Sequence, residues 1–383
     1  FAPGTKVTGR AHWVEPRLVA EVAFSEWTRE QRVRHAVFHG LREDKPPAEI
    51  TREPNAAAAP ARRKGARGRS AAPAPDASAA LPPDFKLTNP ERVVDTSTGV
   101  TKLDMLRFYA QVAGVMLPHL AHRPVALVRA PGGIDGELFF QKHSERYTMQ
   151  GIEALDPALD PGQKRLLAVA RAEGLLSAAQ MNVIEFHTWN ATTVAIDRPD
   201  RMTFDLDPGE GVGWPEMQQA AWLVRSLLDD LGLPAFLKTS GGKGLHLEVP
   251  LRPRHGWDDV KGFSQAVVQH LARALPERFV AKSGPRNRVG RIFIDYLRNG
   301  YGATTVAAWS ARARPGLGVS VPIAWDELDG LPSSTAWTVR NAHERVPVGN
   351  APWKDHEQRR VTLEPAMRAL GFQASGPENR NAA

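Results

Sequence analysis

Two aspartates separated by a single residue lie in the segment Met202-Thr-Phe-Asp-Leu-Asp-Pro-Gly209, whose apolar residues indicate a strand. Because side chains alternate along a strand, Asp205 and Asp207 should share one face, roughly 6.6 Å apart. Carboxylates at that spacing can hold two divalent metal ions about 3.5–4 Å apart. The alternative is a pair of solvated carboxylates on an exposed strand, although Asp is disfavoured in strands.

A third aspartate, Asp295, lies in the apolar segment Arg291-Ile-Phe-Ile-Asp-Tyr296. A carboxylate among such neighbours is not expected to be buried without a partner. A metal shared with Asp205 and Asp207 would supply that partner. The alternative is a salt bridge to Arg291 or Arg298.

A glycine-rich turn lies in the segment Lys238-Thr-Ser-Gly-Gly-Lys-Gly-Leu-His246. Such a turn can expose backbone N–H groups to a phosphate, Ser240 can donate a hydrogen bond, and Lys243 supplies a point charge. His246 could reach the same anion from the next strand. The spacing differs from that of the P-loop, and a simple glycine-rich hairpin is the alternative.

Further polar candidates flank these motifs. His187 follows a strand-like run, and a lone histidine is more often structural than catalytic. Arg312 and Arg314 can hold a triphosphate through bidentate contacts, with a solvated loop as the alternative.

Two adjacent aromatic residues, Phe139 and Phe140, should point to opposite faces of a strand. One ring is therefore expected in the core. The other could stack on a nucleic-acid base, a contact worth roughly 1–3 kcal/mol. Burial of both rings is the competing interpretation.

These candidates require a scaffold of helices and strands. Apolar spacing predicts helices over 101–113, 214–231 and 258–275, with Thr101 as the N-cap of the first. Short apolar runs predict strands over 124–129, 138–142, 235–239, 245–249 and 291–296. The expected fold class is α/β or α+β, with a central mixed sheet and flanking helices.

The composition is that of a basic globular protein. The 383 residues carry a formal net charge of +7 and include no Cys, so a thiolate metal site is excluded, and the charge favours a polyanionic partner such as nucleic acid. No apolar run is long enough for a transmembrane helix, and no membrane partner is expected. The chain starts at Phe1 without a signal-peptide pattern, so a cytoplasmic segment of a longer protein is expected.

Composition divides the chain into zones. Residues 1–45 contain two strand-like runs, 18–24 and 32–38, which predict a β-hairpin. Residues 46–83 are rich in Ala, Pro and basic residues and should be a flexible linker, either a plain spacer or a basic tether on DNA. Residues 84–375 form the expected globular body, and 376–383 a disordered tail.

Taken together, the motifs resemble a known family. Asp205-Leu-Asp207, Ser240-Gly-Gly-Lys-Gly-Leu-His246 and Phe293-Ile-Asp295 resemble the three catalytic motifs of archaeo-eukaryotic primases. Further segments, over roughly residues 84–375, resemble the polymerase domain of bacterial DNA ligase D: Leu87-Thr-Asn-Pro-Glu-Arg92, Leu138-Phe-Phe-Gln-Lys-His143, Gly290-Arg-Ile-Phe-Ile-Asp-Tyr-Leu-Arg-Asn299 and Ala311-Arg-Ala-Arg-Pro-Gly316.

The first zone resembles the end of the ATP-dependent ligase domain of the same enzyme. The runs 18–27 and 34–45 look like the last strands of its OB-fold and its final ligase motif, with Ala36 where the family usually has Pro. The domain that carries the adenylated lysine is absent, so ligation by this chain alone is not expected.

The resemblance implies roles for individual residues. Asp205, Asp207 and Asp295 would be catalytic and would bind two Mn²⁺ or Mg²⁺ ions. Arg92 and Lys102 would bind a DNA 5′-phosphate, Arg92 replacing the more usual Lys. The incoming nucleotide and bases would be held by His187, Ser240, Lys243, His246, Arg312, Phe139 and Phe140.

The implied function is DNA-dependent nucleotidyl transfer, in which gaps are filled and 3′ ends are extended with NTPs or dNTPs during non-homologous end joining. The implied partners are DNA with 5′-phosphorylated ends or gaps, Ku, and the ligase domain of the same enzyme, in a cytoplasmic, nucleoid-associated setting. Two alternatives remain: another metal enzyme with an Asp-x-Asp motif, such as a nuclease or glycosyltransferase, and a non-catalytic module that bridges 5′-phosphorylated DNA ends.

Overall fold

The computed structural model describes Leu81, residues 84–144 and 149–374, and the backbone of four short strands between residues 19 and 42. The chain divides into two compact units, Phe1–Ser70 and Ala71–Ala383. Apart from Leu81, the linker expected over 46–83 lies outside the described residues, as does the tail over 376–383.

The first unit contains the hairpin that the sequence predicts. Strand β1 (Val19–Ala23) pairs antiparallel with β4 (Val37–Arg42), and β2 (Glu26–Trp27) pairs antiparallel with β3 (Val33–Arg34). The returning strand therefore ends at Arg42 rather than at Phe38.

The second unit holds a six-stranded sheet with the order β15-β16-β12-β14-β13-β18, which is antiparallel except for the parallel pair β15 and β16. We call it the aspartate sheet, since Asp205, Asp207 and Asp295 lie on it. Its strands are β12 (Arg201–Pro208), β13 (Phe236–Thr239), β14 (Leu245–Pro250), β15 (Phe279–Val280), β16 (Ile292–Asp295) and β18 (Pro322–Ile323).

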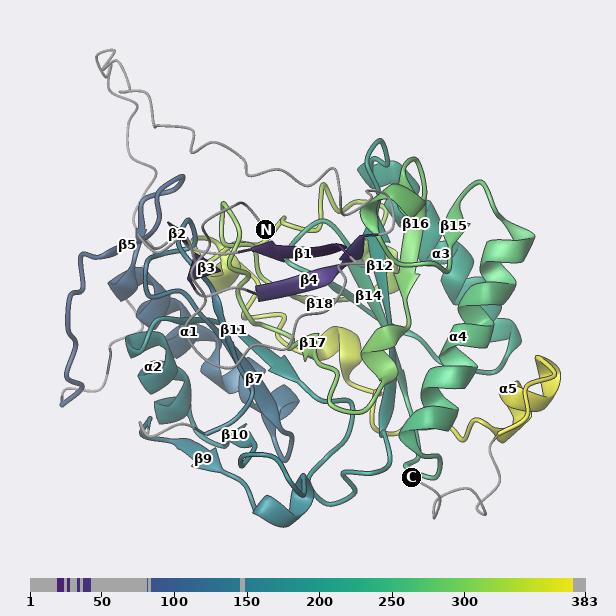
Figure 1. Ribbon diagram of the computed structural model, residues 1–383, viewed down its shortest axis with the longest axis horizontal. Helices are drawn as coiled ribbons and strands as arrows, with labels where there is room; N and C mark the ends of the chain where they lie inside the picture. Colours follow the sequence, from purple (N-terminus) through teal and green to yellow (C-terminus); the bar gives the residue numbers. More distant parts are fainter. Residues whose placement is uncertain are drawn as a thin grey trace, which may run out of the picture. The chain divides into compact units, whose positions relative to one another are not determined.

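One face of the aspartate sheet is apolar because every second residue of its strands is large and hydrophobic. Phe204, Leu206 and Leu247 are fully buried in one core with residues of α3 (Trp214–Asp230) and α4 (Trp257–Ala274). Figure 1 shows these two helices beside the sheet. The opposite face is left for the polar residues of the same strands.

A second six-stranded sheet, with the order β17-β11-β7-β10-β9 and β8 paired to β7, completes the scaffold. Its core is formed with α1 and α2, which lie beside β7 and β11 in Figure 1. The elements are α1 (Lys102–Leu120), α2 (Ala172–Gln180), β7 (Val125–Arg129), β8 (Phe139–Gln141), β9 (Ile152–Ala154), β10 (Leu167–Val169), β11 (Val183–Thr188) and β17 (Thr305–Val306).

Smaller elements complete the body. A two-stranded sheet, β5 (Val93–Asp95) with β6 (Val100–Thr101), leads into α1. The remaining helix and turns are α5 (Glu364–Ala369), η2 (Pro157–Leu159), η3 (Pro285–Arg288), η4 (Leu297–Asn299), η5 (Trp325–Glu327), η6 (Ala342–Glu344) and η7 (Ala351–Trp353).

The sequence predictions agree with these elements. Thr101 is the N-cap of α1 and forms a capping box with Asp104, but the helix continues to Leu120, seven residues past its predicted end. The helices predicted over 214–231 and 258–275 begin and end within one residue of α3 and α4. No helix among the described residues is both long and apolar enough to cross a membrane.

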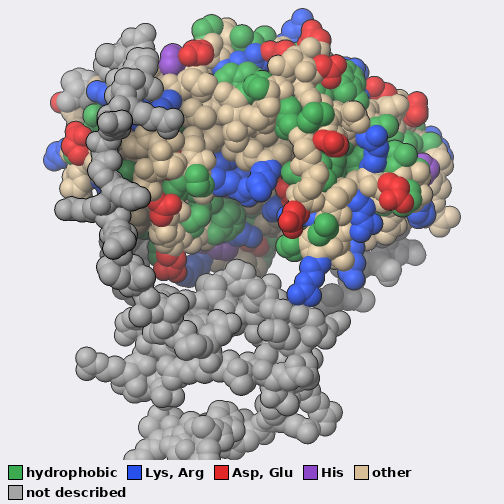
Figure 2. All heavy atoms as spheres, turned by 90° about the horizontal axis from the view of Figure 1, so that it is seen from above, with side chains coloured by type: hydrophobic (Ala, Val, Ile, Leu, Met, Phe, Trp, Pro, Cys, Tyr) green, Lys and Arg blue, Asp and Glu red, His purple; other side chains and the backbone are tan. Residues whose placement is uncertain are grey.

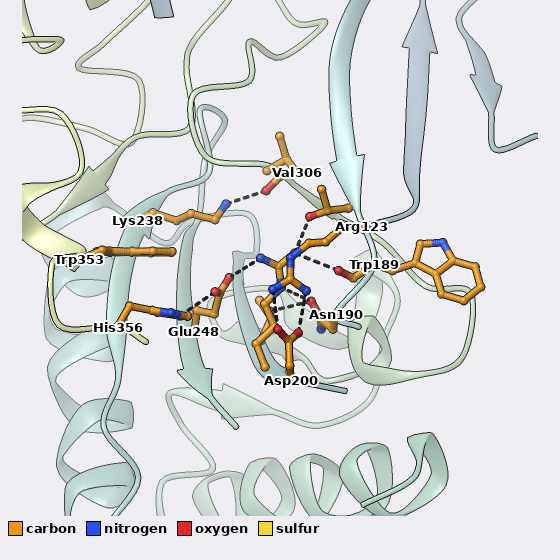
Figure 3. A network of polar contacts seen from close by, with 12 residues as sticks. Arg123, Trp189, Asn190, Asp200, Lys238, Glu248, Val306, Trp353 and His356 are labelled. Carbon is orange, nitrogen blue, oxygen red and sulfur yellow. Dashed lines mark hydrogen bonds and ion pairs between the residues drawn. The ribbon is translucent and has the colours of Figure 1, made fainter. Parts of the chain in front are cut away.

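A buried polar network fixes the strands that carry the site (Figure 3). Asp200 forms a bidentate ion pair with Arg123, at 2.6 and 2.7 Å. Arg201, at the start of β12, donates to Asn190 at 3.0 Å and lies 3.5 Å from Glu248 of β14. Because buried charges are costly unless paired, this network specifies how the strands meet.

Candidate functional site

Four ionisable residues form a row across the polar face of the aspartate sheet. In the strand register, Lys238 of β13 lies opposite His246 of β14, His246 lies opposite Asp205 of β12, and Asp205 lies opposite Asp295 of β16. All four are buried. Residues directly opposite on antiparallel strands have Cβ atoms about 4.5–5.5 Å apart, so the fold brings two of the three predicted carboxylates together.

The carboxylates in this row are paired with basic groups. His246 Nε2 lies 3.2 Å from Asp205 Oδ1, and Arg298 Nε lies 3.0 Å from Asp295 Oδ2 and 3.8 Å from Asp205 Oδ2. The salt bridge that the sequence offered as the alternative for Asp295 is therefore present, and its partner is Arg298 of the two arginines named. Asp205 is buried, so the alternative of a solvated carboxylate is wrong for this residue, whereas the side chain of Asp207 is 39% exposed.

Asp207 completes the carboxylate group two residues along β12, where it lies opposite Phe293. Its Oδ2 is 3.1 Å from Arg288 Nη1. Burial and the negative charge of Asp205 raise the pKa of Asp207 to about 6, against the opposing effect of Arg288. An added cation beside this carboxylate would lower its pKa again, because an opposite charge favours the ionised form.

The pKa values of other groups in the row are also shifted. Burial raises the pKa of Asp295, whereas for Asp205 the attraction of His246 and Arg298 outweighs burial and lowers the pKa. Burial lowers the pKa of His246 to about 4, so its ring is neutral at pH 7. Its Nδ1 is buried without a hydrogen-bond partner among the described residues.

The donor set suits a hard divalent cation, because carboxylate oxygens are preferred ligands of Mg²⁺ and Mn²⁺. Within residues 84–144 and 149–374, no three acidic or histidine side chains converge as a ready-formed metal site. Arg288 and Arg298 occupy the carboxylates instead. Cation binding at Asp205, Asp207 and Asp295 would have to displace these two guanidinium groups.

The glycine-rich turn after β13 is organised by Ser240. Its Oγ accepts hydrogen bonds from the backbone N–H groups of Gly242 and Gly244, at 3.1 and 3.0 Å. These two amides therefore face the serine rather than outward as the sequence predicts, because the hydroxyl satisfies them locally. Gly244 cannot carry a side chain, since a Cβ there would lie 2.2 Å from the carbonyl oxygen of Leu206.

A cavity of about 100 Å³ lies between the turn and the carboxylates. Lys243 is exposed at its rim, and Arg298, Arg312 and Arg314 also line it. Figure 2 shows Lys and Arg side chains interspersed with Asp and Glu side chains on one face of the molecule. Carboxylates and four cationic side chains thus share one small polar cavity.

Arg312 connects the two sheets. Its Nη1 donates to the carbonyl oxygen of Ser240 at 2.9 Å, and its Nε donates to Glu185 of β11 at 3.1 Å. The same Glu185 carboxylate contacts His187 Nε2 at 2.7 Å and accepts from the N–H of Ala313 at 2.7 Å. Arg312 is therefore held in the site and does not lie on a solvated loop.

The aromatic pair on β8 differs from the expectation that one ring is buried. Phe139 and Phe140 are 48% and 49% exposed, because β8 is a short strand paired only with β7 and its faces are not both covered. Phe140 packs edge-on against His187 with 5.6 Å between ring centroids. The expectation of one core ring and the competing interpretation that both rings are buried are therefore both wrong, and either ring is exposed enough to stack on a base.

Arg92 and Lys102 lie side by side at the open end of the β5–β6 pair. The backbone N–H of Lys102 donates to the carbonyl oxygen of Arg92 at 2.8 Å. The Lys102 ammonium is buried and donates to the carbonyl oxygen of Thr88 at 2.9 Å. Burial and the charge of Arg92 lower the pKa of Lys102, and no carboxylate pairs with it among the described residues.

Three residues that contact the candidate site residues in the structure were not proposed from the sequence. Glu185 lies two residues before His187, so strand alternation could have placed it on the same face. Arg298 was considered only as a salt-bridge partner of Asp295. Arg288 carries no local signal, since a turn places it against Asp207.

Comparison with known proteins agrees with this geometry. The family model for the LigD primase-polymerase domain matches residues 101–353, and the model for the C-terminal region of ATP-dependent DNA ligases matches residues 2–45. The ligase D polymerase domain of Mycobacterium tuberculosis, solved in complex with DNA, superposes with a TM-score of 0.65 at 30% identity, covering 72% of this chain and 99% of that one.

Two curated relatives are named as multifunctional non-homologous end joining proteins LigD. The one from Pseudomonas aeruginosa is 52% identical over 96% of this chain and 43% of its own length. The one from Mycolicibacterium smegmatis is 35% identical over 63% of this chain and 32% of its own. The chain spans less than half the length of these two relatives.

The expected primase-type fold class is confirmed by the likeness to the mycobacterial domain. The family model covers the strands that carry all three aspartates, the glycine-rich turn and Arg312. The chain therefore belongs to the LigD primase-polymerase family.

Proposed function

We propose that this chain transfers nucleotides from NTPs or dNTPs to the 3′-hydroxyl of DNA, filling gaps and extending ends. The observation that carries the proposal is the register of Asp205 opposite Asp295, beside a cavity that Lys243 and Arg312 also line. Nucleotidyl transfer needs both charges at one place, because a triphosphate requires cations and its catalytic ions require carboxylates.

Asp205, Asp207 and Asp295 would hold two Mn²⁺ or Mg²⁺ ions. When bound, such ions lower the pKa of the attacking hydroxyl and stabilise charge on the leaving pyrophosphate. The chain's own residues orient the nucleotide. Lys243 and Arg312 lie where they can neutralise a triphosphate, and His246, which lines the same cavity, would contact the nucleotide.

DNA would be held on both sides of the gap. Phe139 and Phe140 are exposed enough to stack on bases. Arg92 and Lys102 would hold a 5′-phosphate, because a buried ammonium without a carboxylate partner favours an anion. The mycobacterial polymerase domain to which the chain is similar was solved in complex with DNA, which supports this assignment.

The cellular role that we propose is gap filling during non-homologous end joining of double-strand breaks. It would occur in the cytoplasm at the nucleoid, beside Ku and the ligase domain of the same enzyme. The names of the relatives support this role. The proposal does not include ligation, because the ligase match over residues 2–45 is to the C-terminal region of ATP-dependent DNA ligases.

The test is extension of a 5′-phosphorylated, gapped primer with NTPs, dNTPs, Mn²⁺ and Mg²⁺. Wild-type protein should lengthen the primer, and Asp205→Ala should abolish extension while DNA binding persists. Shortened primers would indicate a nuclease instead. Tight binding of 5′-phosphorylated ends without turnover under any metal would indicate the end-bridging module.

A further inference from the structure

Asp95 ends strand β5, three residues after Arg92, and its carboxylate is almost fully buried at 1% exposure. Oδ1 accepts from the backbone N–H of Ser97 at 2.9 Å and from its hydroxyl at 2.7 Å. Oδ2 accepts from the hydroxyl of Thr98 at 2.7 Å. Three of its four hydrogen bonds thus stay within the turn between β5 and β6.

The fourth hydrogen bond leaves this turn. The backbone N–H of Gly316 donates to Asp95 Oδ2 at 2.9 Å. Gly316 ends the segment 311–316, which carries Arg312 and Arg314 into the nucleotide cavity. Asp95 therefore joins the strand of the 5′-phosphate residue Arg92 to the segment that holds the predicted triphosphate ligands.

This segment and the residue Gly318 that follows it are in close contact with the glycine-rich turn. A Cβ added to Gly318 would lie 2.4 Å from the carbonyl oxygen of Gly241, so the two backbones pack without a side chain between them. Arg312 Nη1 also donates to the carbonyl oxygen of Ser240. A displacement of the 311–316 segment would therefore also displace Ser240.

We propose that Asp95 is a positioning residue that couples binding of a DNA 5′-phosphate at Arg92 and Lys102 to binding of the incoming nucleotide. This inference rests on the proposed function of both sites. Asp95 itself contacts neither the 5′-phosphate nor the nucleotide in this proposal. The coupling passes through the hydrogen bond to Gly316.

The physical reason lies in the two cations that flank β5 and β6. Val93 and Thr101 are paired in register, so Arg92 and Lys102 are adjacent and repel one another. A phosphate bound between them removes the repulsion and fixes the spacing of the two strands. Asp95, anchored in the turn that joins those strands, then holds the Gly316 N–H in a narrower range of positions.

The test measures nucleotide affinity in the presence of Mn²⁺ on a gapped DNA whose primer ends in a dideoxynucleotide. The downstream strand carries either a 5′-phosphate or a 5′-hydroxyl. In wild-type protein the phosphate should tighten nucleotide binding by about fivefold or more, the lower bound of usual coupling between sites. In Asp95→Asn the ratio of the nucleotide Kd with 5′-hydroxyl DNA to the nucleotide Kd with 5′-phosphate DNA should fall to about one.

The matched control is Asp135→Asn. Asp135 accepts a hydrogen bond from Thr96 of the same turn at 2.5 Å, and its carboxylate makes no contact with residues 311–316 within the described part of the chain. It should keep the wild-type ratio. Affinity of Asp95→Asn for 5′-phosphorylated DNA without nucleotide should also equal that of wild type.

Three results would overturn the proposal: an unchanged ratio in Asp95→Asn, no coupling in wild-type protein, or loss of 5′-phosphate binding itself in Asp95→Asn. The proposed function fails separately, if wild-type protein does not extend an unblocked primer. If Asp95→Asn does not fold, amide exchange of residues 312–318 in wild-type protein decides. Exchange should be slower with 5′-phosphate DNA than with 5′-hydroxyl DNA, and equal exchange would refute the coupling.

Discussion

Asp205 and Asp295 lie directly opposite one another on adjacent antiparallel strands, and the single guanidinium of Arg298 contacts both carboxylates. Like charges at directly opposite positions destabilise a sheet. Arg298 is the more exposed partner, at 43% for its side chain, and compensates this repulsion only in part. The row is therefore expected to respond strongly to added cations.

Divalent ions should stabilise the folded protein through these carboxylates. At a concentration of Mn²⁺ about 100 times its Kd, the free energy of unfolding should rise by about 2.7 kcal/mol. Asp205→Asn and Asp295→Asn should remove most of that gain, measured as melting temperature with Mn²⁺ against EDTA. Without metal, Asp295→Asn should be no less stable than wild type, because it removes the repulsion. Equal Mn²⁺ stabilisation of all three proteins would contradict the assignment.

Glu185 should be essential for the geometry of the nucleotide site. Hydrogen bonding from His187 and the charge of Arg312 outweigh burial and lower the pKa of Glu185 to about 2. Glu185→Gln leaves Arg312 without its carboxylate, and the loss of a buried partner costs about 3–5 kcal/mol. We expect roughly 1.4 kcal/mol of nucleotide binding free energy to be lost when Arg312 is no longer held. That loss corresponds to about a tenfold rise in the KM for the nucleotide.

The control for this variant is Glu153→Gln, which alters an exposed glutamate on β9 of the same sheet. It should change neither melting temperature nor KM. Denaturant unfolding and steady-state extension kinetics measure the two effects. A Glu185→Gln protein with wild-type KM would show that Arg312 does not hold the nucleotide.

Lys238 should give the protein a pH-dependent stability in the alkaline range. Its ammonium is buried, donates to the carbonyl oxygen of Val306 at 2.9 Å and to Ser320 Oγ at 2.8 Å, and burial lowers its pKa to about 7. The pKa of lysine in an unfolded chain is about 10.4, so the folded state loses the proton first. This contribution to stability is complete above about pH 10.4 and is lost as the pH falls through 7.

Replacement by methionine should flatten that dependence. Between pH 7 and pH 10, the free energy of unfolding of wild-type protein should rise by on the order of 3 kcal/mol relative to that of Lys238→Met. Each pH unit well inside the range between the two pKa values contributes about 1.4 kcal/mol, and less near either pKa. Denaturant melts at several pH values measure the difference. Lys243→Met, at an exposed position, should follow the wild-type curve, and parallel curves for wild type and Lys238→Met would refute the prediction.

Phe139 and Phe140 should matter for DNA and little for folding. Both rings are about half exposed, so alanine at either position should cost under about 1 kcal/mol, against about 3–5 kcal/mol for a buried phenylalanine such as Phe186. Loss of one stacked base should weaken DNA binding by roughly 1–3 kcal/mol. Melting curves and DNA titrations separate the two effects. If the alanine variants were strongly destabilised but bound DNA as wild type does, the two rings would contribute to the hydrophobic core rather than to DNA binding.

Much of the scaffold follows from local sequence. The alternation of Phe204, Asp205, Leu206 and Asp207 defines one apolar and one polar face, and the structure buries the apolar face under helices that the sequence also predicts. Thr101 with Asp104 fixes the start of α1. These features were predictable because strand alternation and helix capping act over only two to four residues.

Two predictions were wrong, one because neighbours far along the chain decide burial, and the other because of a side-chain contact within a turn. The strand of Phe139 and Phe140 has alternating faces, but whether something covers each face depends on the sheet edge. The amides of the glycine-rich turn face Ser240 because that hydroxyl lies inside the turn. Neither outcome can be read from composition or spacing.

The sequence by itself determined the residue types of the site: three carboxylates on strands, a serine and glycines in a turn, and a set of cations. Only the tertiary structure decided that Asp295 lies opposite Asp205, that Glu185 holds Arg312, and that Asp95 bonds Gly316. Strand register and contacts across more than a hundred residues depend on how the two sheets bury their apolar faces. That burial is a property of the whole chain rather than of any segment.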